Sequence, residues 1–208
     1  MTDDILGAAT AVSNEVKKLY RDDRDVDAML STAVAGIAYC EKHAAVEPDE
    51  HKRRELLRLA RSIGFNAAAN CWPGWDDPGV TIEPSHIIRG LDIAQHSEAL
   101  AQELGLPPRN LGGAIWLTGA LHLANGEPQT ARTSFERAER TFLTDPELAA
   151  YALMARGYVA LADAMEPLGR DAAGARLEST FELLRADGSK DAAFFIDQLA
   201  TAKRVLER

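Results

Sequence analysis

The stretch Gly112–Pro146, which reads GGAIWLTGALHLANGEPQTARTSFERAERTFLTDP, decides the fold class of this 208-residue chain. In its first half Gly119 stands three residues before His122, and Gly126 then interrupts the segment. Its second half carries small and aromatic residues at intervals of four and three, namely Ala131, Phe135 and Ala138. Residues three and four apart lie on one face of a helix. The stretch therefore predicts two short helices joined by a glycine turn, with small residues where a neighbouring backbone approaches closely.

This pattern resembles one tetratricopeptide repeat, a unit of about 34 residues with the signature G-x2-Y, then A-x3-F, then a closing proline. Gly119 stands in the place of the family's glycine and His122 in that of its aromatic residue, while Pro146 comes three residues after the place of its closing proline. The resemblance implies an all-α, tetratricopeptide-like superhelix of stacked antiparallel helix pairs. It also implies a concave side that binds another protein or a peptide.

The rest of the chain agrees with an all-helical fold. Alanine and leucine dominate and aromatic residues make up 6% of the chain, a composition that favours helices over strands. Apolar residues recur at helical spacing, so we expect about nine helices and no strand. Beyond the central pair, the expected helices cover 3–20, 25–45, 50–71, 84–104, 148–164, 171–186 and 190–207. Pro167 and Gly169 are expected to end the helix that starts at residue 148.

We expect one repeat domain over residues 1–208, because this length suits one domain or one short repeat array. Its predicted parts are an N-terminal helix pair at 1–47, a first repeat-like pair at 48–106 with an inserted loop at 72–84, the best repeat at 108–146, and C-terminal helices with a capping helix at 147–208.

Charge and cysteine content restrict the partners. The net charge is −9 and the sequence pI is about 5.1, so we expect neither nucleic acid nor an anionic membrane as a partner. The longest uncharged run, residues 110–126, is at the short limit for a membrane helix, and we expect it to be buried inside the helical stack. No secretory signal is visible, and Cys40 and Cys71 are the only cysteines. We therefore expect a cytoplasmic protein without disulfides.

The loop at 72–84, WPGWDDPGVTIEP, is the best candidate site. Its prolines and glycines prevent a continuous helix, and a loop of more than about 12 residues in a compact domain is usually functional or disordered. In one interpretation Trp72 and Trp75 present aromatic faces to a ligand, while Asp76 and Asp77 contact a cation. In the other, which we favour, both indoles fold back onto the helical body, because buried tryptophan mostly serves packing.

Three arginines, Arg54, Arg58 and Arg61, form a stripe at intervals of four and three. They would suit an acidic peptide. The alternative, which we favour, is a solvated face on which Glu50 pairs with Arg54.

The histidines and cysteines are weaker candidates for a binding, metal or catalytic site. His122 is expected to be packed and hydrogen-bonded in its repeat position, with ligand contact as the alternative. Cys40, His43 and Cys71 lack an evident fourth partner for zinc, so we expect neither a metal nor a cofactor. No catalytic motif is present, and an enzyme is the less favoured class.

Our main expectation is therefore a protein–protein or peptide interaction scaffold, with contacts from Trp72, Trp75, Arg58, Arg61 and His122. One alternative is a helical enzyme that binds a small molecule or a metal under the Trp72–Trp75 loop, using Asp76, Asp77, His86 and Cys71. Another is a homodimerisation module built on the last helix, with Phe194 and Phe195 at the interface.

Overall fold

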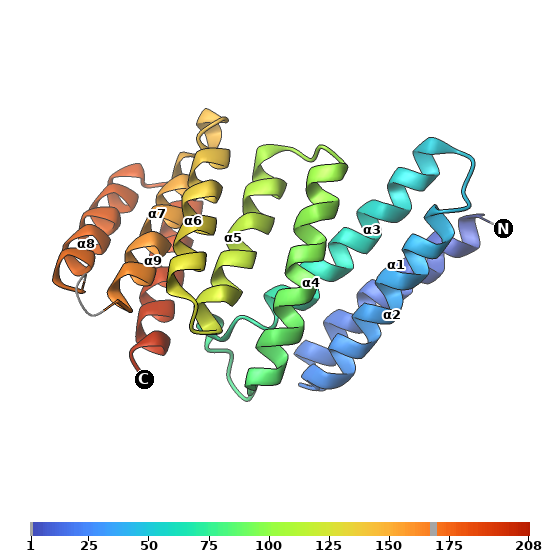
Figure 1. Cartoon of the computed structure of the whole chain (residues 1–208), viewed down its shortest axis with the longest axis horizontal. Helices are drawn as coiled ribbons and strands as arrows, with labels where there is room; N and C mark the ends of the chain where they lie inside the picture. Colours follow the sequence, from blue (N-terminus) through green and yellow to red (C-terminus); the bar gives the residue numbers. More distant parts are fainter. Residues whose placement is uncertain (1, 167–169) are drawn as a thin grey trace. The chain divides into compact units, whose positions relative to one another are not determined.

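The computed structural model describes residues 2–166 and 170–208, and this part of the chain is all-α. It contains nine α-helices, two short 3-10 helices and no strand within those residues, which confirms the predicted fold class (Figure 1). The helices are α1 (Thr2–Arg21), α2 (Val26–Ala44), α3 (Glu50–Ala69), η1 (Pro73–Trp75), α4 (Pro84–Glu103), α5 (Pro108–Ala124), α6 (Pro128–Phe142), η2 (Pro146–Leu148), α7 (Ala149–Ala164), α8 (Arg170–Asp187) and α9 (Lys190–Leu206). Pro167 and Gly169, which were expected to end α7, lie outside the described residues.

Short polar side chains set several helix starts. Asp25 accepts a hydrogen bond from the backbone N–H of Ala28 at 2.8 Å, and Ser189 accepts one from Ala192 at 3.1 Å. Asp49 does the same at the start of α3. Each bond satisfies a backbone donor that has no partner inside its helix. This is why these boundaries could be predicted from sequence to within a few residues.

The chain forms two compact units, and the first consists of residues up to Trp72 together with Gly79–Leu106. In this unit α1 packs against α2, α2 against α3 and α3 against α4, each pair as antiparallel neighbours. In addition α1 contacts α3 and α2 contacts α4, so that the four helices form two layers.

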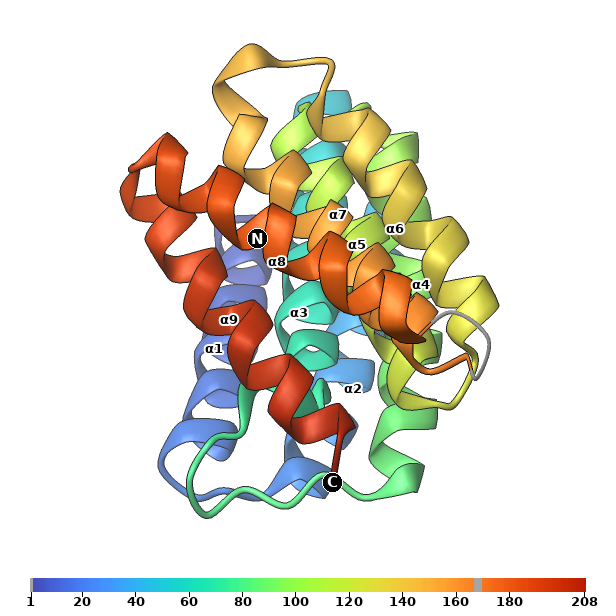
Figure 2. The same cartoon turned by 90° about the vertical axis from the view of Figure 1, so that its left-hand side faces the viewer.

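The second unit consists of Pro73–Pro78 and Pro107–Arg208. Here α5, α6, α7 and α8 each pack against the next helix, while α9 contacts α7, α8 and η1 (Figure 2). The inserted loop is therefore divided, because its η1 segment packs within unit 2 while Trp72 belongs to unit 1. The prediction of one repeat domain stays a prediction.

Glycines let the helices of unit 2 approach closely. A Cβ atom at Gly119 would lie 2.8 Å from Cε1 of Phe135, and one at Gly112 would lie 2.5 Å from Cε1 of Phe142. Both distances are too short for a real contact, so each glycine gives an aromatic ring of α6 the space to pack against the backbone of α5. Gly126 has a φ of +77° in the turn between the two helices, a conformation that glycine adopts without strain.

The uncharged run at residues 110–126 forms most of α5. Leu117 and Leu121 are fully buried and Ile115 is 3% exposed, as expected for a helix covered on several sides. Within the described residues, no helix combines the length and the apolar character needed to cross a membrane.

Replacing Gly119 with alanine should destabilise the protein by about 1–3 kcal/mol, because the added methyl group collides with a fully buried ring. Equilibrium unfolding in urea measures the change. Gly113→Ala, on the same helix and with no atom within 4 Å of the new Cβ, is the matched control and should stabilise by up to about 1 kcal/mol. Equal effects of the two substitutions would contradict the close approach of α5 and α6.

Candidate binding site

Trp72 lies in the core of unit 1. It follows the end of α3, and its backbone N–H donates to the carbonyl of Ala69 at 3.1 Å. The residue is only 1% exposed. Its indole therefore packs into the helical body, as in the interpretation that we favoured for this residue, and presents no face to solvent.

Trp75 and Asp76 lie in unit 2 and contact residues far away in sequence. The Trp75 ring stands 6.0 Å from that of Trp116, measured between centroids. The Asp76 carboxylate accepts hydrogen bonds from Arg204 at 3.2 Å and from Arg208 at 2.9 Å. Arg208, and after it Arg204, hold the pKa of Asp76 below its ordinary value. The cations that Asp76 contacts are thus two arginines of the chain itself, while its neighbour Asp77 is exposed.

The arginines of the predicted stripe on α3 make different contacts. Arg54 donates to the carbonyl oxygen of Leu104 at 2.7 Å, just after the end of α4. The partner of Glu50 is Arg53, at 2.8 Å, so the predicted pair with Arg54 is wrong. Arg53 and Glu50 are three residues apart, and this spacing brings side chains together as readily as a spacing of four.

Arg61 and Arg58 differ sharply in environment. The Arg61 guanidinium lies 4.5 Å from the centroid of the Phe65 ring, in the geometry of a cation–π contact. Arg61 is 9% exposed, and this burial lowers the pKa of its guanidinium. Arg58 is exposed and has no ion pair among the described residues.

His122 fastens the turn between α5 and α6. Its Nδ1 lies 2.6 Å from a carboxylate oxygen of Glu127, and Asn125 donates to the other oxygen at 2.6 Å. The hydrogen bond from His122, followed by that from Asn125, lowers the pKa of Glu127. This arrangement agrees with the expected packed and hydrogen-bonded histidine.

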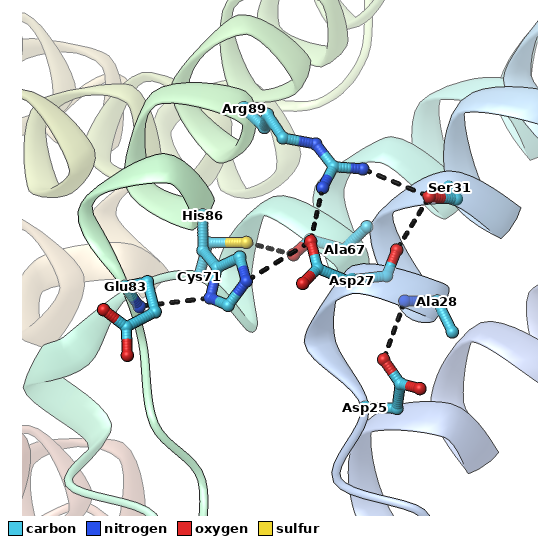
Figure 3. A network of polar contacts seen from close by, with 9 residues as sticks. All are labelled: Asp25, Asp27, Ala28, Ser31, Ala67, Cys71, Glu83, His86 and Arg89. Atoms are coloured by element: carbon cyan, nitrogen blue, oxygen red, sulfur yellow. Dashed lines mark hydrogen bonds and ion pairs between the residues drawn. The ribbon is translucent and has the colours of Figure 1, made fainter.

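His86 lies in a polar network at the starts of α2 and α4 (Figure 3). The backbone N–H of Glu83 donates to His86 Nδ1 at 3.1 Å, and His86 Nε2 faces an oxygen of Asp27 at 3.5 Å. Arg89 donates to the same Asp27 oxygen at 2.7 Å and to Ser31 at 3.3 Å. A backbone N–H always donates, so Nδ1 accepts here and the proton of the neutral ring sits on Nε2. The network joins α2 to α4.

Cys71 lies near this network in Figure 3 but is not set up as a nucleophile. It is fully buried, and burial raises the pKa of its thiol to about 12. Its sulfur donates to the carbonyl oxygen of Ala67 at 3.4 Å. Both nitrogens of His86 already face other groups, so neither is left to accept the thiol proton.

Metal and small-molecule sites do not coincide with the predicted residues. In residues 2–166 and 170–208, no three His, Cys, Asp or Glu side chains are grouped so that they could hold a metal ion. A cavity of about 550 Å³ lies among α7, α8 and α9, with an apolar wall that includes Leu161, Leu177 and Leu206. None of the residues predicted for a ligand site under the Trp72–Trp75 loop lines this cavity.

The seven predicted binding residues are therefore distributed over two units. Unit 1 holds Trp72, Arg58 and Arg61, and unit 2 holds Trp75, Asp76, Asp77 and His122. Arg204 and Arg208, which hold Asp76, were not predicted. Their spacing of four residues was visible, but no periodicity links them to an acid about 130 residues away.

Comparison with known proteins adds little to this description. No protein-family model and no curated protein matches the chain. Among solved structures the chain is similar to the DHF79 filament, with a TM-score of 0.28 and 18% sequence identity, over 100% of this chain and 97% of that one. We describe the chain as an all-helical protein of sequential antiparallel helix pairs.

Neither cysteine should react with Ellman's reagent in the native protein at pH 8. Burial raises the pKa of Cys40 to about 11 and that of Cys71 to about 12, and thiolates are the reactive form. Both thiols should react at once in denaturant, which is the control. Rapid reaction of a thiol without denaturant would contradict its burial.

Glu127 should add to stability in a pH-dependent manner. Its pKa is lowered in the folded state from an ordinary value of 4.5, so its contribution is present above that value and is lost as the pH falls through the lowered pKa. The side chain is 42% exposed, which limits the effect to less than about 1 kcal/mol. The free energies of unfolding of Glu127→Gln and of the unmodified chain should differ at pH 6, and the difference should disappear as the pH falls through the lowered pKa of Glu127. A constant difference would show that charge is not the cause.

Proposed function

We propose that this protein is a tetratricopeptide-like scaffold that binds a protein or peptide partner through the exposed face of α3. Helix pairs of this kind present preformed surfaces, so that little ordering entropy is lost when a partner binds. The proposal rests on the state of Arg58. The neighbouring arginines Arg53, Arg54 and Arg61 each contact a group of the chain itself, whereas Arg58 is exposed without an ion pair among the described residues.

The surroundings of Arg58 suit a peptide that carries a carboxylate. Arg58, Ser62 and Phe65 are spaced by four and three and so share one face of α3. Phe65 is half-buried and is stacked with Arg61, which fixes an aromatic side chain about two helical turns from Arg58 on the same face. Arginine and aromatic residues are enriched where binding energy is concentrated, and guanidinium groups bind carboxylates through paired hydrogen bonds.

Site-specific photo-crosslinking in the producing cells tests this function. A benzoylphenylalanine at Ser62 should capture a defined partner, whereas the same probe at Thr133, an exposed position on α6, should not. Arg58→Glu should reduce the yield of the crosslink from position 62 by about tenfold or more. The substitution removes a guanidinium contact of hot-spot type and adds repulsion between the new carboxylate and the carboxylate of the partner.

Arg140→Glu is the matched control, since Arg140 is another exposed arginine and its substitution changes the net charge equally. It should leave the crosslink unchanged. Equal capture at positions 62 and 133, or an equal loss in both charge variants, would count against α3 as the binding face.

A further inference from the structure

The helix α9 turns one apolar side toward the rest of unit 2. Ala192, Leu199 and Ala202 are fully buried and Phe195 is 5% exposed. These residues are spaced by three and four, so they form one stripe along the helix. The stripe faces α7, α8 and η1, the elements that α9 contacts.

The α7 surface beneath this stripe is shaped for a helix. A Cβ atom at Gly157 would lie 2.6 Å from a methyl carbon of Leu199, so the missing side chain provides the space in which Leu199 sits. The Tyr151 ring receives Phe195 edge-on, with 4.8 Å between centroids. Next to Gly157, the Tyr158 hydroxyl accepts a buried hydrogen bond from Gln198 at 3.1 Å. A buried polar contact of this kind favours one register of the bound helix, because a shifted helix would lose this hydrogen bond.

The C-terminal end of α9 and the residues after it form ion pairs with Asp76, directly after η1. Arg208 donates to both carboxylate oxygens of Asp76 at 2.9 Å, and Arg204 donates at 3.2 Å. The arginine side chains are 58% and 59% exposed and that of Asp76 is 29% exposed. Such solvent-screened pairs stabilise little, so their main effect is to select which helix end fits beside η1.

We propose that α7 and η1 form a helix-binding site, that α9 is its built-in occupant, and that the α9 of a second copy of this chain takes its place. Every contact described above is made by side chains of α9 or of the residues directly after it, so this segment from a second copy would make the same contacts. Only Gly188, with a φ of +69°, and Ser189 separate α8 from α9. Exchange of an identical element between copies is a low-cost route to a dimer. This site is separate from the α3 face.

Exposed apolar side chains beside the α8–α9 connection favour a second copy as the occupant. Two chains that exchange α9 cross at this connection. The described residues include six exposed large apolar side chains, and two of them flank it: Leu183, 44% exposed, and Phe194, 56% exposed. A crossing partner would cover both, and burial of apolar area is favourable.

Charge reversal provides the test. One full-length variant is Asp76→Arg, and the other combines Arg204→Glu with Arg208→Glu. In each variant, position 76 and the end of α9 carry charges of the same sign. This repulsion weakens the binding of the chain's own α9 to α7 and η1. The probes are labelled synthetic peptides of residues 188–208, one with the natural sequence and one with both arginines reversed to glutamate.

The natural peptide should bind the Arg204→Glu/Arg208→Glu chain about tenfold or more tightly than the Asp76→Arg chain, and the reversed peptide should show the opposite order. A mixture of the two full-length variants should form a heterodimer in native mass spectrometry, because each α9 then meets an opposite charge on the other copy. The triple variant restores the match within one chain and should bind neither peptide more tightly than the unmodified protein does.

Lys190→Glu combined with Lys203→Glu is the matched control, because it makes the same charge change on α9 away from Asp76. It should behave like the unmodified chain, and circular dichroism should show that every variant is helical. Peptides that do not distinguish the two reversed chains would overturn the proposed site. A mixture that remains monomeric would overturn exchange between copies. Neither result depends on Arg58, so the function proposed for α3 is tested separately.

Discussion

The close contact between a glycine on one helix and a large side chain on the next sets the spacing of the helices in unit 2. At Gly119 the ring of Phe135 takes the space of the missing side chain, and at Gly157 the methyl groups of Leu199 do so. Helix interiors disfavour glycine by about 1 kcal/mol relative to alanine. Denser packing offsets this cost, because a buried side chain gains many weak dispersion contacts when a backbone comes within reach.

This constraint explains why neighbouring helices pair. A glycine can accommodate a side chain only from a helix whose apolar stripe is in the matching register along the helix axis. A short turn between two helices fixes that register. Gly126, with a φ of +77°, closes the turn between α5 and α6 in this way. The bond from His122 to Glu127 then fastens the same turn. The result is that α5, α6, α7 and α8 pack in chain order through contacts between sequence neighbours, whereas α9 also packs against α7 and η1.

The same locality decides what the sequence could predict. Helix boundaries follow from nearby residues such as Asp25, Asp49 and Ser189, and the prediction of nine helices and no strand is confirmed for the described residues. The loop at 72–84 was recognised from its prolines and glycines. Its partners could not be recognised, since the contact of Asp76 with Arg208 joins positions far apart in the chain. Predicting it requires knowing that η1 packs beside α9, which depends on tertiary packing rather than on periodicity.

The glycine contacts also limit how selective a helix-binding surface can be. A space such as that at Gly157 accepts a leucine from any helix of suitable shape, because dispersion forces do not distinguish one aliphatic group from another. Selectivity must therefore come from polar contacts, which depend on the position and charge of both groups. On α7 such a contact is made by the Tyr158 hydroxyl, and just after η1 by the Asp76 carboxylate. The segment 190–208 makes both contacts. A helix without a glutamine in the same register would lose the buried hydrogen bond, and one without a terminal pair of arginines would lose the exposed ion pairs. The apolar contacts thus determine how tightly a helix is held, and the two polar contacts determine which helix is accepted.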